Sequence, residues 1–148
     1  MIIHRFTAAQ VGLNSTTLPA VTGSLNSTIL PCSQCSAVSV WVNYTYAAAT
    51  NVQYQLVFYS QYISGAANAT YTVGTNDYQA VSENIVTGTG TLSLYNQIIA
   101  VSASGRWVDT FPVPVGADAW QLKNIFGTSS TTDSLTVIAT IAQIGSRT

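Results

Sequence analysis

The chain has 148 residues, of which 47% are hydrophobic and only 6% are charged, with a formal net charge of -1. This length is typical of one domain that buries a sizeable core without disulfide or metal scaffolding. Four basic residues are too few for the phosphate contacts that nucleic-acid binding needs, and no apolar run of about 18 residues is present to span a bilayer, so we expect neither a nucleic-acid nor a membrane partner.

The few charges are unevenly placed, because residues 6–76 contain no Asp, Glu, Lys, Arg or His. A free monomer normally stays soluble through mixed surface charge. A neutral surface of Ser, Thr, Asn, Gln and Tyr therefore favours contact with other subunits, or exposure outside the cell. The alternative is that the low charge content reflects a general amino-acid bias of the source organism.

Residues 1–36 are polar and rich in β-branched residues, and Pro19 interrupts any helix. We expect an extended N-terminal arm or irregular lead-in with no helix. Residues 1–30 show no basic start followed by an apolar core and a small-residue cleavage site, so no secretory signal is predicted.

Cys32 and Cys35 form the only motif in the chain that could support metal binding or redox chemistry. Structural zinc needs four ligands, whereas the chain offers these two thiols and the distant His4. Redox catalysis needs a helix within a βαβ pattern, and none is predicted. The main interpretation is a structural pair, reduced or bridged by a disulfide; a metal or disulfide shared between subunits is the alternative. We expect no bound metal and no cofactor.

Period-two alternation begins after Ala37 and indicates half-buried strands. Residues 38–46 and 52–59 alternate clearly and predict two adjacent strands joined by a short connection, with Trp41 on the polar face of the first. Residues 63–91 are rich in Gly, Ala, Asn and Thr and predict loops between short extended pieces such as 69–73.

The C-terminal half continues the same alternation. Further strands are expected at 92–101, 107–111 and 135–141, with a chain turn at Pro112 and Pro114. Six to eight short strands with regular turn signals, and no helical stripe, predict an all-β fold. We expect residues 37–148 to form one antiparallel β-sandwich, jelly-roll-like in its connections.

No catalytic constellation emerges, and we expect the chain not to be an enzyme. Its carboxylates mostly occupy turn-like contexts where Asp binds nearby backbone: they are Asp77, Glu83, Asp109, Asp118 and Asp133. His4 has no nucleophile in a recognisable context, and no glycine pattern for nucleotide binding is present. Arg106 and Asp109 are close enough in sequence to predict a local ion pair.

Aromatic residues are the remaining candidates for a functional role. Several lie on both faces of the two strands at 38–46 and 52–59, and one of those faces must pack the core. Trp41, Tyr59 and Tyr62 are candidates for the outer face, as subunit contacts or as a platform on which sugars stack. The alternative is that they also pack in the core.

Four segments together resemble small β-sandwich virion proteins of tailed bacteriophages, capsid decoration (cement) proteins above all. They are residues 38–45, 52–61, 106–122 and 134–140. The resemblance implies a non-catalytic virion protein that is made in the host cytoplasm, binds the major capsid protein on the capsid surface, and self-associates as a homotrimer. It identifies no functional residue.

The expected interface combines the N-terminal segment with the outer aromatic residues. We hypothesise that residues 1–31 reach a neighbouring subunit, with Ile2 and Ile3 as contacts beside Trp41, Tyr59 and Tyr62. A carbohydrate- or receptor-binding module of a phage fibre or tail is the alternative function. A hydrolase, which needs a suitably spaced carboxylate pair, is a third.

Overall fold

The computed structural model describes residues 1–20, 25–60, 78–81, 84–86, 92–94, 96–128 and 132–143. Its elements in chain order are β1 (Ile2–Phe6), α1 (Ala8–Val11), β2 (Thr16–Thr17), β3 (Leu30–Pro31), β4 (Cys35–Thr45), β5 (Asn51–Ser60), β6 (Tyr78–Val81), β7 (Asn84–Val86), β8 (Leu92–Leu94), β9 (Asn96–Ala100), β10 (Gly105–Pro112), β11 (Ala119–Gly127) and β12 (Ser134–Gln143). The expected extended piece at 69–73 lies outside the described residues.

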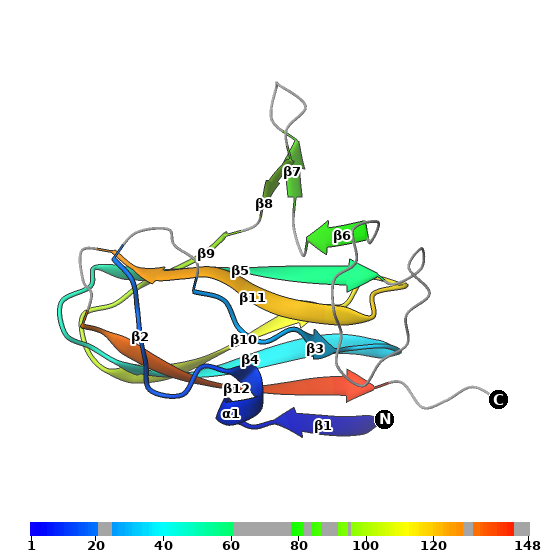
Figure 1. Cartoon of the computed structure of the whole chain (residues 1–148), viewed down its shortest axis with the longest axis horizontal. Coiled ribbons are helices and arrows are strands. Elements are labelled where there is room, and N and C mark those ends of the chain that lie inside the picture. Colours follow the sequence, from blue (N-terminus) through cyan, green and yellow to red (C-terminus); the bar gives the residue numbers. More distant parts are fainter. Residues whose placement is uncertain are drawn as a thin grey trace.

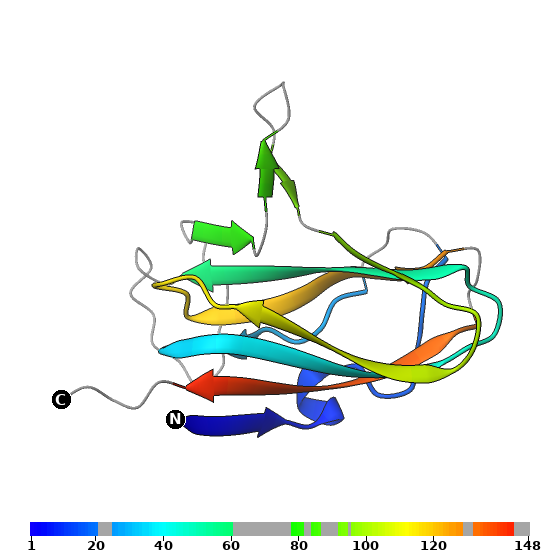
Figure 2. The ribbon, with the colours of Figure 1, turned by 180° about the vertical axis from the view of Figure 1, so that it is seen from behind.

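Two antiparallel sheets pack face to face (Figure 1). Sheet A has the strand order β1-β12-β4-β10, with β2 also paired to β12; Figure 2 shows these four strands following one another across the sheet. Sheet B has the order β3-β11-β5-β6, with β9 also paired to β5, and β7 and β8 form a separate small ladder. The expectation of an all-β antiparallel sandwich is confirmed, and jelly-roll connectivity stays a prediction.

The core lies between the sheets because successive side chains of a strand point to opposite faces. Val38, Val40 and Val42 of β4 are at most 3% exposed and point toward sheet B. Leu56 and Phe58 of β5 are buried opposite them. Each such side chain stabilises the fold by about 1.5–3 kcal/mol, so the alternation in the sequence determines which face of each strand is buried.

β4 and β5 belong to opposite sheets, so they are not adjacent strands of one sheet as the sequence suggested. The chain crosses from sheet A to sheet B between residues 46 and 50. Alternation fixes which face of a strand is buried, and a hairpin and a crossing satisfy that requirement equally. The backbone N–H groups of Ala48 and Ala49 in this crossing donate to the carboxylate of Asp133, at 2.9 and 3.3 Å.

The N-terminal segment is part of the sandwich, which corrects the interpretation of residues 1–36 as an arm. β1 pairs with β12 over its whole length, and Val11 and Leu13 are fully buried in the core. The backbone N–H of Val137 donates to the carbonyl of Leu13 at 2.9 Å. The described parts of residues 1–36 therefore pack in the same sandwich as β4, β5, β11 and β12.

The short helix α1 was not expected from the sequence, although its signal is present. Thr7 and Gln10 form a capping box, in which the Thr7 side chain accepts from the Gln10 backbone and the Gln10 side chain accepts from the Thr7 backbone. Gly12 ends the helix at φ 82°, a conformation that favours glycine. The helix turns the chain from the edge of sheet A into the core.

Candidate functional site

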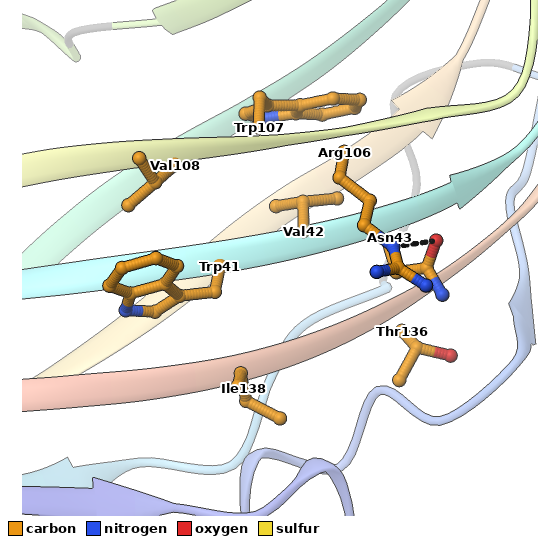
Figure 3. A pocket seen from close by; sticks show the side chains of 8 residues that line it. All are labelled: Trp41, Val42, Asn43, Arg106, Trp107, Val108, Thr136 and Ile138. Atoms are coloured by element: carbon orange, nitrogen blue, oxygen red, sulfur yellow. Dashed lines mark hydrogen bonds between the residues drawn. The ribbon is translucent and has the colours of Figure 1, made fainter.

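The outer face of sheet A carries an exposed apolar row. Trp41 on β4 lies in register with Ile138 on β12 and Val108 on β10, so the three side chains cross three neighbouring strands (Figure 3). Trp41 is 47% exposed and Val108 is 46% exposed. The period-two alternation places them here, because their neighbours Val40 and Val42 fill the core.

Polar side chains flank this apolar row on both sides. In one direction the next register row consists of Thr136, Asn43 and Arg106. In the other direction the indole Nε1 of Trp41 donates to Oγ1 of Thr140 at 3.0 Å. This hydrogen bond satisfies the polar edge of the indole and restrains the ring on the sheet.

The face is hollowed beside Trp41, with a volume of about 560 Å³. The hollow is open to solvent, and its lining is Trp41, Val42, Asn43, Arg106, Trp107, Val108, Thr136 and Ile138 (Figure 3). The position of Trp41 was predicted from the sequence. Asn43 follows Trp41 on the same face of β4 by the same alternation. The lining residues of β10 and β12 were not predicted, because alternation does not reveal which strands pair.

Arg106 and Asp109 do not form the expected local ion pair. They are three positions apart on β10, so their side chains point to opposite faces of sheet A. Nε of Arg106 donates to Oδ1 of Asn43 at 3.4 Å on the outer face. Asp109 points inward, toward sheet B.

The edge of sheet A opposite β10 is also apolar and exposed. β1 ends the strand order on that side, and Ile2 and Ile3 are 53% and 58% exposed. Met1 precedes them at 89% exposed. Two of the sequence-predicted contact residues, Ile2 and Ile3, thus lie together at one edge, while Trp41 lies at the centre of the face.

Tyr59 is buried, so the expectation that it lies exposed is wrong. It is 4% exposed on the outer side of sheet B, where it clusters with Val57, Ala119 and the half-buried Ile29. Its hydroxyl donates to Oε1 of Gln121 at 2.9 Å. Alternation correctly placed Tyr59 away from the main core but could not show that this side is covered. Tyr62 lies outside the described residues.

Cys32 and Cys35 are both buried and are not joined by a disulfide. A tight turn separates them, in which the backbone N–H of Cys35 donates to the carbonyl of Cys32 at 3.1 Å and Gln34 adopts a φ of 60°. Burial, with smaller contributions from the charges of Cys35 and Asp118, raises the pKa of Cys32 to about 12. A thiol with so high a pKa is a poor nucleophile at neutral pH, which fits the structural interpretation.

A second hollow, of about 440 Å³, places His4 near this pair. Its lining includes His4, Cys32 and Cys35, although His4 lies about thirty residues before the two cysteines in the sequence. Nε2 of His4 is hydrogen-bonded to Oε1 of Gln143 at 2.8 Å. Over the described ranges, no group of three or more His, Cys, Asp or Glu side chains is arranged to hold a metal ion.

Asp109 lies in a polar cluster that joins the two sheets. The hydroxyl of Tyr54 on β5 donates to its carboxylate, and Nε2 of Gln97 on β9 donates to it at 3.4 Å. Nε1 of Trp107 in turn donates to the Tyr54 hydroxyl at 3.2 Å. Burial raises the pKa of Asp109 above its ordinary value.

We predict that Asp109→Asn alters the pH dependence of stability. Because the folded state raises the pKa of Asp109, it binds this proton more tightly than the unfolded chain does, and stability declines as pH rises from about 4 through the folded-state pKa. The amide cannot ionise, so the variant should gain stability relative to the parent between about pH 3 and pH 7. Urea unfolding across this range measures the effect, and two parallel profiles would contradict it.

Asp133 and Asp118 also act as structural acceptors. Asp133 is fully buried and accepts from the Tyr44 hydroxyl and from two backbone N–H groups of the β4–β5 crossing. Oδ1 of Asp118 accepts from the Ser33 hydroxyl at 3.1 Å. The sequence predicted turn-like Asp residues, but it did not show that Asp133 binds a loop distant in sequence.

The fold and the site together define an all-β sandwich with an exposed apolar row on one sheet and an exposed apolar edge strand. Comparison of the chain with protein-family models, curated proteins and solved structures finds no match. Within the described residues, no helix has the length and hydropathy needed to cross a bilayer.

Proposed function

We propose that the chain is a non-catalytic virion protein that binds the outside of an assembled phage capsid and stabilises it, as decoration proteins do. The observation that carries this proposal is the exposed apolar edge of sheet A. Met1, Ile2 and Ile3 lie there in solvent, in a chain that has no Asp, Glu, Lys, Arg or His between Arg5 and Asp77. The resemblance of the sequence to phage decoration proteins supports the same conclusion.

The edge strand β1 has the features of a docking element. β12 pairs with one side of β1, and no other described strand pairs with its second side. An edge strand of this kind offers backbone N–H and C=O groups to a partner strand, and exposed apolar side chains add buried area on contact. Its partners in this proposal are the major capsid protein and further copies of the chain, arranged as a trimer.

The described carboxylates support a structural role over catalysis. Asp133, Asp109 and Asp118 each accept hydrogen bonds from residues distant in sequence, and Asp133 and Asp109 connect separate elements of the sandwich. These bonds hold the carboxylates in the framework of the fold. A protein that binds only the assembled shell stabilises it by mass action, without any reaction.

Co-sedimentation with capsids of the source phage tests the proposal. The capsids are first stripped of this protein and then mixed with the purified chain. We expect the double variant Ile2→Asp/Ile3→Asp to bind at least about tenfold more weakly, because each carboxylate must lose its hydration at the interface. Val115→Asp is the matched control, since Val115 is an exposed apolar residue outside β1.

The control variant should bind capsids as the parent does. Circular dichroism and thermal unfolding establish that both variants remain folded. Equal binding by the parent and the β1 double variant would overturn the role of this edge, and absence of binding by the parent chain would overturn the proposed function.

A further inference from the structure

We infer that the hollow on the outer face of sheet A is a binding site for a sugar that carries a carboxylate, such as a uronic or sialic acid. The inference goes beyond capsid binding, because it concerns the β10 side of sheet A, away from the β1 edge. It stands on three observations: a restrained aromatic ring, a cation that pairs with none of the described carboxylates, and a row of neutral polar groups beside them.

Trp41 supplies a stacking surface. The residue is 47% exposed, and the hydrogen bond from the indole Nε1 to Thr140 restrains the ring on the sheet. The face of an aromatic ring carries partial negative charge and packs against the partly positive C–H groups of a pyranose ring. A ring already restrained loses little conformational freedom on binding, which favours affinity.

Arg106 supplies the positive charge at the rim of the hollow. The one hydrogen bond of its side chain is from Nε to Asn43, and this bond directs the guanidinium along the row that flanks Trp41 (Figure 3). The three carboxylates in the described part of the chain lie elsewhere: Asp109 faces sheet B, Asp133 is buried, and Asp118 binds Ser33. The two Nη groups are therefore available for a bidentate bond to a ligand carboxylate.

Asn43 and Thr136 complete the site with neutral donors and acceptors. Both lie in the register row next to Trp41, on neighbouring strands, and both line the hollow. Amide and hydroxyl groups match the hydroxyl groups of a sugar, while Ile138 and Val108 extend the apolar surface on either side of the indole. The volume of about 560 Å³ lies within the range of small-molecule sites.

The charge of the face selects an acidic ligand. Arg106 and Arg5 are the charged residues on the outer face of sheet A, and no described Asp or Glu lies on this face. A neutral sugar leaves the guanidinium of Arg106 unpaired, whereas a carboxylate pairs with it through charge-assisted hydrogen bonds. We therefore expect acidic sugars to bind more tightly than neutral sugars of the same ring shape.

Saturation-transfer difference NMR and calorimetric titration test the site on the full chain. The probes are methyl glucuronoside and N-acetylneuraminic acid, with methyl glucoside as the neutral match for the first. We expect the parent chain to bind the two acidic sugars at least about tenfold more tightly than the glucoside. Arg106→Gln should remove this preference and leave the weak binding of the glucoside unchanged.

Two further variants separate stacking from charge. Trp41→Ala should abolish binding of all three sugars, whereas Trp41→Phe, which keeps an aromatic ring, should retain part of it. Arg5→Gln is the matched control, because Arg5 lies on the same face but outside this hollow, and it should bind as the parent does. Circular dichroism establishes that each variant remains folded.

Three results would overturn the inference. They are no binding of either acidic sugar at about 20 mM, an affinity for them that Arg106→Gln leaves unchanged, and binding of acetate as tight as that of the acidic sugars. The last result would identify a simple anion site. The β1 double variant should keep full sugar binding, so failure of this inference is distinguishable from failure of the capsid proposal.

Discussion

Asp133→Ala is expected to lower the free energy of unfolding by about 3–5 kcal/mol, the largest effect of any single polar substitution that we predict. The Asp133 carboxylate is fully buried and accepts from the Tyr44 hydroxyl and from the backbone N–H groups of Ala48 and Ala49. Alanine removes this acceptor from the buried Tyr44 hydroxyl and Ala49 N–H and from the partly buried Ala48 N–H. Each buried donor left unsatisfied costs about 1–3 kcal/mol. Urea unfolding at pH 7 measures the loss.

A double-mutant cycle with Tyr44→Phe identifies the source of that loss. Tyr44→Phe removes one donor and leaves the two backbone donors paired with Asp133, so it should cost only about 1–2 kcal/mol. The double variant should be less destabilised than the sum of the single variants, because one shared bond is counted twice. Strict additivity, or a loss below about 1 kcal/mol for Asp133→Ala, would show that Asp133 does not hold the β4–β5 crossing.

Leu13→Ala is expected to destabilise the protein by about 3 kcal/mol. Leu13 is fully buried in the core cluster although it precedes the first predicted strand by more than twenty residues. Truncation removes its apolar contacts and leaves a cavity that the surrounding β-sheets fill only in part. Thermal or urea unfolding of the purified variant measures the effect.

The matched control is Ile3→Ala in the same N-terminal segment. Ile3 is 58% exposed, so its truncation should change the free energy of unfolding by less than about 0.5 kcal/mol. Equal, small effects at both positions would restore the interpretation of this segment as a peripheral arm. Equal, large effects would place β1 in the core, which its exposure contradicts.

The alternation of the sequence was sufficient to predict the fold class. Val38, Val40 and Val42 point to the core, and Trp41 points away from it, as the period of two requires. The cluster of β-branched and aromatic residues after Ala37 and the turn signals between strands made an antiparallel sandwich the best interpretation. These are local properties, and a single sequence carries them directly.

The pairing of the strands could not be predicted, because it depends on contacts between distant parts of the chain. β12 lies between β1 and β4, which brings strands more than a hundred residues apart in sequence together in sheet A. The N-terminal segment cannot form a core alone, and it gains stability by pairing β1 with β12 and by packing residues such as Val11 and Leu13 against strands formed later in the chain. Its polar composition therefore predicted an arm.

The candidate site was predictable in part. Trp41 was identified because aromatic residues lie on both faces of the two alternating strands and only one of those faces packs the core. Asn43 shares that face by the same alternation, because it lies two positions along β4 from Trp41. Arg106 could not be placed beside Trp41 without the register between β10 and β4. Tyr59 has the same alternation signal as an exposed residue, yet it is covered on sheet B by contacts that include the half-buried Ile29.

The copy number of the chain in purified particles of the source phage tests the central claim most directly. Quantitative mass spectrometry, with the major capsid protein as the internal reference, measures it. A protein that decorates the capsid surface should be present in hundreds of copies per particle, in a fixed ratio to the major capsid protein. A handful of copies, or none, would contradict a decorating role.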